Sequence, residues 1–310
     1  MHGHSHEGGH GHGGGSATRA FATVTLINLA YTLVEAGYGF STDSLALLSD
    51  ALHNFGDVLG LGLAWGAAVL ARRAPTARHT YGWRRATLLS PLANALLLVA
   101  FAGALSWEAL RRLGAPPQIP ALPVIVVAAI GIVVNLGAAF LIRDGHGHAH
   151  AHDLNRRGAF LHLMADAAVS LAAVLAGLGM LRLGWQWLDP VTALLVGVVV
   201  AASAFALLRD AFNAAMDAVP SNIDQAAVRA FLQAQDGVVA VHHLHIWSLG
   251  AGEVAMTAHL VRPGDGDHDD FIDRLAHGLD ERFGINHPTL QIERGSACEH
   301  DRHDRAPHGG

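Results

Sequence analysis

The chain has 310 residues, of which 51% are hydrophobic and 15% are charged, and its net charge at pH 7 is −6. This composition, together with a positive mean hydropathy, argues against an ordinary soluble enzyme, and we expect no nucleic-acid partner. The single cysteine, Cys298, excludes an internal disulfide framework. The length allows one membrane bundle and one small soluble domain.

Two segments are rich in histidine. Residues 1–17 combine histidine with glycine, and alternating histidines between 146 and 152 repeat the pattern in a loop over residues 144–156. Such segments contain too few apolar residues to build a core, so we expect them to be mobile. They either hold Zn²⁺ weakly and raise its concentration near the membrane domain, or are passive low-complexity sequence.

Six stretches are apolar and long enough to cross about 30 Å of hydrocarbon, which predicts six transmembrane helices. The loops on one side of these stretches contain ten arginines, and the loops on the other side contain three. Because positive residues are retained on the cytoplasmic side, both termini are expected in the cytoplasm, and an even number of spans agrees. The stretches are residues 20–40, 44–70, 87–110, 119–142, 158–181 and 188–208.

Two matching motifs, His53-x-x-x-Asp57 and His162-x-x-x-Asp166, lie near the middle of the second and fifth stretches. A spacing of four places both side chains of a motif on one helical face, about 40° apart. An aspartate at the bilayer midplane costs roughly 2.5–3.5 kcal/mol, so such residues are candidates for function. Hydrogen bonding between helices is the alternative role. Two imidazoles and two carboxylates also match tetrahedral Zn²⁺, and the repetition at similar depth favours an ion site.

The composition changes after Arg209, where the long apolar runs end and charged residues become frequent. A helix capped by Ser221 is expected next, then two strands joined by a Gly-rich turn, a second helix and a last short strand. The expected fold is a membrane all-α six-helix bundle followed by a small α+β cytoplasmic domain of the order α-β-β-α-β. The elements of this domain are expected at 222–235, 238–249, 253–261, 269–283 and 289–293. The expected boundaries are 1–17 for the N-terminal segment, 18–209 for the membrane domain, 210–294 for the α+β domain and 295–310 for a flexible tail.

The first strand of this domain carries three histidines within residues 241–247. Strand alternation places His242 on the face of Leu244 and Ile246, and the other two histidines on the opposite face. A lone histidine facing a core is usually structural, but several on adjacent strands beside a glutamate favour a surface metal site. The candidate ligands of this cytoplasmic site are His242, His259, His287 and Glu293.

Several segments, in the same order, resemble the cation diffusion facilitator family, and the resemblance covers nearly the whole chain. The segments are SLALLSDALHNFGD (44–57), YGWRR (81–85), RGAFLHLMAD (157–166), the pair Asp189-Pro190 and VHHLHIW (241–247).

The resemblance implies a homodimeric metal²⁺/H⁺ antiporter of the zinc-transporting type, in the inner (plasma) membrane of a bacterial cell. Each protomer would have six spans and a metallochaperone-like cytoplasmic domain that helps it to dimerise. The resemblance makes the two H-x-x-x-D motifs the transport site, and members with two His and two Asp there are typically zinc-selective. It maps the regulatory ligands of the cytoplasmic domain onto His242, His259 and Glu293, whereas Gln291 departs from the His of some members.

The chemistry of the four-residue site suggests how transport would be driven. Imidazole binds Zn²⁺ only when neutral, so metal and protons compete at His53 and His162. Metal would load from the cytoplasm, and protonation from the other side would release it after the bundle rocks outward. Tetrahedral geometry disfavours Mg²⁺ and Ca²⁺, while Co²⁺, Ni²⁺ and Cd²⁺ remain secondary substrates. Glu35 either lines an access path or relays protons.

Two other functions use the same residues. One is a membrane zinc metalloenzyme with Asp50 as its general base, and the other is a membrane-anchored metal sensor. The sequence contains no H-E-x-x-H, no G-x-S-x-G, no Walker loop and no D-K-T-G motif. Without a module that handles ATP, transport would have to draw on an ion gradient, and we favour the antiporter.

Overall fold

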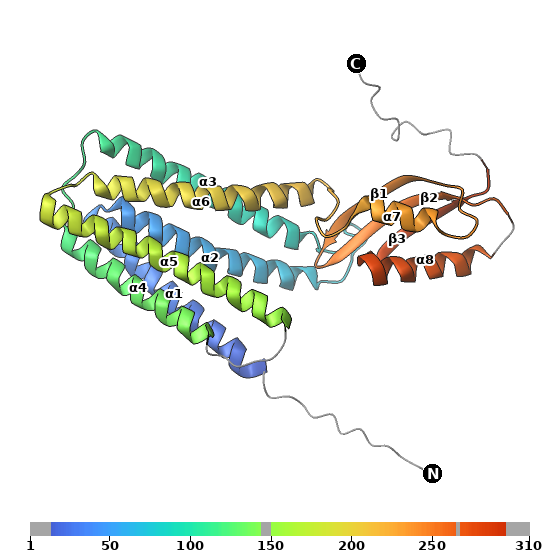
Figure 1. Ribbon diagram of the computed structural model, residues 1–310, viewed down its shortest axis with the longest axis horizontal. Coiled ribbons are helices and arrows are strands. Elements are labelled where there is room, and N and C mark those ends of the chain that lie inside the picture. Colours follow the sequence, from blue (N-terminus) through green and yellow to red (C-terminus); the bar gives the residue numbers. More distant parts are fainter. Residues whose placement is uncertain (1–13, 144–149, 265–266, 296–310) are drawn as a thin grey trace, which may run out of the picture. The chain divides into compact units, whose positions relative to one another are not determined.

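The computed structural model describes residues 14–143, 150–264 and 267–295. Within these residues six long helices are followed by two shorter helices and three strands (Figure 1). The long helices are α1 (Gly14–Thr42), α2 (Leu45–Ala71), α3 (Ala86–Leu113), α4 (Ala121–Arg143), α5 (His150–Leu183) and α6 (Leu188–Ala215). The later elements are α7 (Gln225–Gln233), β1 (Ala240–Gly250), β2 (Glu253–Val261), α8 (His268–Phe283) and β3 (His287–Glu293).

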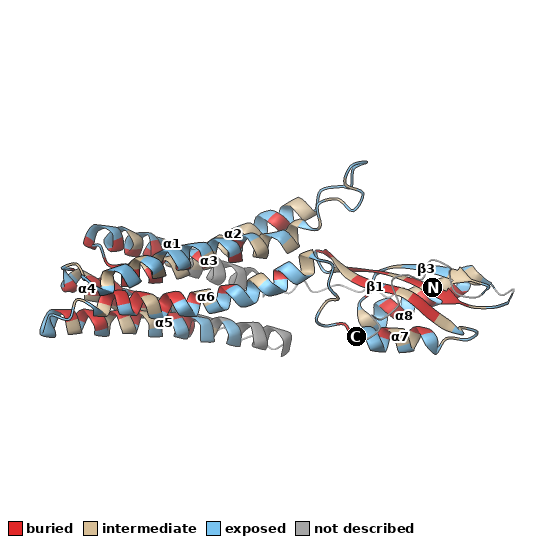
Figure 2. Cartoon of the chain, turned by 90° about the horizontal axis from the view of Figure 1, so that it is seen from above, coloured by how far each residue is buried: buried red, intermediate tan, exposed pale blue. Residues whose placement is uncertain are grey.

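Five of the long helices, α2 to α6, are apolar and long enough within their described residues to cross a membrane. Large apolar side chains such as Trp65, Val133 and Val198 are exposed on them (Figure 2), as expected of surfaces that face lipid. Helix α1 has 29 residues, more than the roughly 20 needed for a span. The expected bundle of apolar helices is confirmed, while the span over residues 20–40 stays a prediction.

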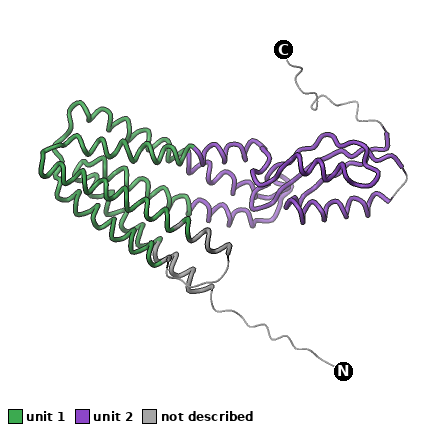
Figure 3. Tube along the Cα trace, in the orientation of Figure 1, with its two compact units in different colours: residues 1–61, 96–205 green, residues 62–95, 206–310 purple. Residues whose placement is uncertain are grey.

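The chain divides into two compact units (Figure 3). The first unit comprises residues 1–61 and 96–205, and the second comprises residues 62–95 and 206–310. The division passes through α2, α3 and α6, so the second unit holds one end of each of these helices as well as the α+β domain. In the first unit α4 packs against α5, and α1 packs against α4. The domain boundaries expected from the sequence stay predictions.

A carboxylate from α6 caps the N-terminus of α2. Asp189 accepts hydrogen bonds from the Ser44 hydroxyl at 2.5 Å, the Leu45 amide at 2.9 Å and the Ala46 amide at 3.2 Å, and it is fully buried. The first amides of a helix have no partner within the helix, and the helix dipole favours a negative charge there. Asp189 therefore fixes the start of α2, about two turns before His53.

The α+β domain has a three-stranded sheet of order β1-β2-β3, with β1 antiparallel and β3 parallel to β2. Because β2 and β3 are parallel they need a crossover, and α8 provides it. Helices α7 and α8 cover one face of the sheet, where Leu232 and Leu275 pack on Met256 and Leu260. The expected order α-β-β-α-β is confirmed. The opposite face carries the candidate ligands.

Two helix starts differ from those expected. Helix α7 begins at Gln225, and its N-cap is Asp224, which accepts from the Ala226 amide at 2.8 Å; the predicted cap, Ser221, lies in the preceding turn. Asp is as good a cap as Ser, and here the later residue has the extended backbone that a cap needs. Helix α5 begins at His150, inside the expected loop over 144–156. The His-rich residues 1–13 and 144–149, and the tail from 296, lie outside the described residues.

Candidate metal centre

The two H-x-x-x-D motifs meet across α2 and α5 in the first unit. The His53 Nε2 atom lies 3.2 Å from Asp166 Oδ1, and His162 Nε2 lies 2.9 Å from Asp57 Oδ2. The two imidazole centroids are 5.8 Å apart. Each histidine therefore contacts the aspartate of the other helix, and His162 Nε2 also lies 3.7 Å from Asp166 of its own motif, as the spacing of four predicts.

Three of these residues already converge as a ligand set. One nitrogen each of His53 and His162 and one oxygen of Asp166 lie within 4.8 Å of one another. Tetrahedral Zn²⁺ needs its ligand atoms roughly 3.3–3.5 Å apart, so small side-chain movements would suffice. Asp57 lies outside this set but contacts His162. Side-chain exposure rises from 1% at Asp166 and 20% at His53 to 38% at Asp57 and 45% at His162, so the site is closed on one side and open on the other.

A network of buried polar groups lies on the same helices and on α1. The Tyr31 hydroxyl donates to Glu35 at 2.7 Å, the Asn54 amide is 3.4 Å from the same carboxyl group, and Ser170 donates to Asp50 at 3.0 Å. Glu35 and Asp50 are fully buried, and neither forms an ion pair with an Arg or His of the described chain. Tyr31 and Ser170 escaped the sequence analysis, although each lies four residues from a carboxylate already noted.

A second cluster forms on the open face of the sheet in the α+β domain. The Glu293 carboxylate lies 3.0 Å from His242 Nε2 and 2.9 Å from His259 Nδ1, and it accepts from the Gln291 amide at 3.1 Å. One ligand atom from each of His242, His259 and Glu293 falls within 4.8 Å of the others. Burial raises the pKa of Glu293, but the hydrogen bonds from the two histidines outweigh it and leave that pKa lowered.

A β-bulge changes the alternation expected along β1. The pairing with β2 shifts between His242 and His245, and His243 has a φ of 50°. Because a bulge inserts an extra residue, Val241 and Leu244 both face the core. The prediction that His242 shares a face with Leu244 is therefore wrong. The same bulge brings the His243 ring within 5.2 Å of His242 and 5.0 Å of His259, so the cluster contains a third imidazole.

The structure does not bring His287 into this cluster. In the register of β2 and β3, His287 pairs with Ala255 whereas Glu293 pairs with Val261, which separates them by roughly 20 Å along the strand. His287 Nε2 instead lies 3.0 Å from Glu253 and 3.2 Å from Arg84 Nη1. It belongs to an ion-pair group formed with the loop between α2 and α3.

Comparisons with known proteins agree with this architecture. The family model described as the cation efflux transmembrane domain matches residues 22–214, and the one described as the cation efflux protein cytoplasmic domain matches residues 220–295. The chain belongs to the cation efflux (cation diffusion facilitator) family. It is therefore a multi-pass membrane transporter of metal cations and not an enzyme. The hypothesis of a membrane zinc metalloenzyme is wrong.

Characterised relatives resemble the chain along nearly its whole length. Zinc transporter ZitB of Escherichia coli is 34% identical over 94% of this chain and 92% of its own. A cadmium, cobalt and zinc/H⁺-K⁺ antiporter of Bacillus velezensis is 31% identical over 97% and 94%, and the metal cation efflux system protein CzcD of Cupriavidus metallidurans is 33% identical over 96% and 91%. The solved metal-bound C-terminal domain of CzcD matches 23% of this chain and 99% of its own, with 33% identity and a TM-score of 0.22.

Proposed function

We propose that this transporter exports Zn²⁺ from the cytoplasm in exchange for protons, and that His53, Asp57, His162 and Asp166 form its transport site. The observation that supports this most strongly is the reciprocal pairing of the two motifs, His53 with Asp166 and His162 with Asp57. Residues that only join helices need no second copy of the same pair at the same place. Here the two pairs bring His53, His162 and Asp166 together, and Asp57 contacts His162 beside them.

The donor set favours zinc over the abundant cellular cations. Mg²⁺ and Ca²⁺ prefer six or more oxygen ligands, whereas two imidazoles and two carboxylates suit a four-coordinate ion. The relatives carry names that include zinc, cadmium and cobalt. We therefore assign Zn²⁺ as the main substrate, with Cd²⁺, Co²⁺ and Ni²⁺ as secondary ones.

Proton coupling follows from the same contacts. A histidine that bonds a carboxylate is well placed to carry a proton, and it must lose this proton to coordinate a metal. Metal and protons would then alternate at one site, and a proton gradient would drive export. The name of the Bacillus relative includes H⁺ as an exchanged ion, which supports this proposal. Because Glu35 is fully buried, we assign it to proton relay and not to an access path.

The arginine bias between the loops supports cytoplasmic termini in a bacterial inner membrane. We also propose a homodimer, in keeping with a match to the cytoplasmic domain of the family. The cluster of His242, His259 and Glu293 would bind cytoplasmic Zn²⁺ as a regulatory ligand.

The experiment that tests the site is Zn²⁺ flux into proteoliposomes containing Asp57→Ala, beside Asp43→Asn as a control that removes an exposed carboxylate outside the site. We expect flux to be lost in the first variant and kept in the second, with both dimers intact by size exclusion. Full flux in Asp57→Ala would move the transport site elsewhere. Tight Zn²⁺ binding without flux in the unaltered protein would favour the sensor.

A further inference from the structure

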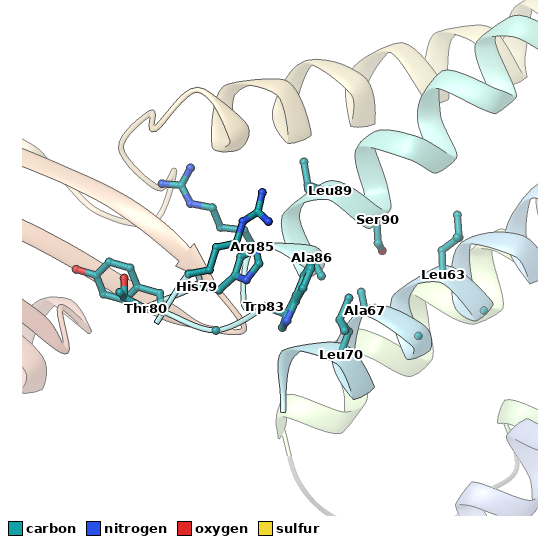
Figure 4. A pocket seen from close by; sticks show the side chains of 15 residues that line it. Leu63, Ala67, Leu70, His79, Thr80, Trp83, Arg85, Ala86, Leu89 and Ser90 are labelled. Carbon is teal, nitrogen blue, oxygen red and sulfur yellow. The ribbon is translucent and has the colours of Figure 1, made fainter. Parts of the chain in front are cut away.

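A pocket of about 740 Å³ lies in the second unit, between the end of α2, the start of α3 and the loop that joins them. Its α2 wall is made by Leu63, Ala67 and Leu70, and Leu89 belongs to its α3 wall. Figure 4 shows Leu63, Ala67 and Leu70 on the side of α2 that is turned toward α3. The pocket is distinct from both candidate metal sites, and the proposed transport does not use it.

The loop side of the pocket has the opposite chemistry. Arg78, His79 and Arg85 line it, together with Trp83, and no Asp or Glu is among the described residues that line it. Figure 4 shows His79, Trp83 and Arg85 on this side. Arg85 donates through Nη2 to Asp217 at 2.8 Å, and both side chains are about half exposed. Arginine matches phosphate oxygens well because its planar group presents several donors.

The placement of these two halves resembles the layering of a bilayer. The leucines belong to helices long and apolar enough to span a membrane, whereas the arginines and Trp83 stand at the helix ends. Aromatic residues favour the level of the lipid head groups, and basic pockets between membrane helices bind anionic head groups. An apolar cleft that ends in two arginines therefore suits a molecule with an acyl chain and a phosphate.

We infer that this pocket binds an anionic phospholipid, with its phosphate at Arg78 and Arg85 and the start of an acyl chain between Leu63, Leu70 and Leu89. The volume accommodates a head group and the first chain segments, and the remaining chain lies in the bilayer. A bound lipid would join α2, which carries His53 and Asp57, to the loop that contacts the α+β domain through Arg84 and Glu253.

The glycines of α2 allow a test that blocks the apolar half alone. Gly66 lines the pocket, and a Cβ built on it meets no atom within 4 Å. Gly66→Leu should therefore fill the pocket without disturbing the packing of the helix. Arg78→Gln with Arg85→Gln removes the polar half. Arg72→Gln with Arg73→Gln is the matched control, because it removes two exposed arginines of the same loop that do not line the pocket.

The measurement is native mass spectrometry of the full-length protein in detergent, with phosphatidylglycerol or phosphatidylcholine added. We expect the unaltered protein and the control to retain phosphatidylglycerol in preference to phosphatidylcholine. Gly66→Leu should lose this retention, and the Arg78/Arg85 variant should bind on the order of thirtyfold more weakly.

Four results would overturn the inference. Equal loss in the Arg72/Arg73 control would reduce the effect to diffuse charge, and equal retention of phosphatidylcholine would remove the requirement for an anion. Displacement of the lipid by glycerol phosphate at the same concentration would indicate a site for free phosphate. A change of dimer content in Gly66→Leu with lipid binding unaltered would mean that a second copy of the chain covers the pocket.

Discussion

Each imidazole of the proposed transport site contacts the carboxylate of the other helix, which ties α2 to α5 at the site. The spacing of four identifies which residues share a face on α2 and on α5. Which histidine meets which aspartate depends on how far one helix is shifted along the other, a property of packing between distant segments. The sequence thus proposes the four residues as one site, whereas the pairs His53–Asp166 and His162–Asp57 come from the structure.

Replacing a transport-site imidazole by a carboxylate should change metal preference. In His162→Asp the donor set becomes one nitrogen and three carboxylates, which suits larger ions that accept more oxygen ligands than tetrahedral Zn²⁺ does. We expect flux of Cd²⁺ or Mn²⁺ to rise relative to Zn²⁺ in proteoliposomes, with total activity retained. If the ratio of fluxes stays that of the unaltered protein, selectivity lies outside these four residues.

The cytoplasmic cluster should bind Zn²⁺ more tightly when one more imidazole is added. Gln291 pairs with His259 across the sheet and contacts Glu293, so Gln291→His places a ligand beside both. We expect an increase in Zn²⁺ affinity on the order of tenfold, about 1.4 kcal/mol, measured by competition titration in an Asp57→Ala background. Thr289→His, two residues along the same strand face, is the control and should leave the affinity unchanged. An equal gain in both variants would mean that added histidines bind metal non-specifically.

At the level of elements, the order and kind of helices and strands followed from periodicity and composition, whereas their local irregularities did not. A regular strand would place His242 on the face of Leu244, whereas the structure places Leu244 in the core with Val241. The bulge at His243 depends on its pairing with β2, which no local pattern encodes. The same is true of the cap on α2, because Asp189 lies 144 positions from Leu45.

That cap should be needed for both stability and transport. Asp189→Asn retains the size of the side chain but removes the charge that three donors share, and hydrogen bonds to charged groups contribute about 1.5–3 kcal/mol. We expect a loss of this order in the free energy of unfolding, with reduced Zn²⁺ flux because the start of α2 positions His53. Asp43→Asn is the matched control, since Asp43 forms an exposed ion pair with Arg112 that contributes at most about 1 kcal/mol. Equal losses in the two variants would argue against a specific role for the cap.

For the molecule as a whole, hydropathy and the change of composition after Arg209 predicted a membrane bundle followed by a small α+β domain, and the fold confirms this class. The division into units was not predictable, because it passes through α2, α3 and α6 and not between the membrane and soluble segments. Contacts such as Arg84–Glu253 and Arg85–Asp217 place the loop after α2 in the same unit as the α+β domain. Such charged contacts join segments far apart in the sequence, and composition alone does not reveal them.

We propose that one site on α2 and α5 exchanges metal for protons. Its most direct test is Zn²⁺ uptake into proteoliposomes with and without an imposed pH gradient, with internal pH recorded in the same vesicles and His53→Ala measured beside the unaltered protein. We predict uptake that depends on the gradient, accompanied by proton movement in the opposite direction, and the loss of both in His53→Ala. Uptake that ignores the gradient, or that persists in His53→Ala, would contradict the account.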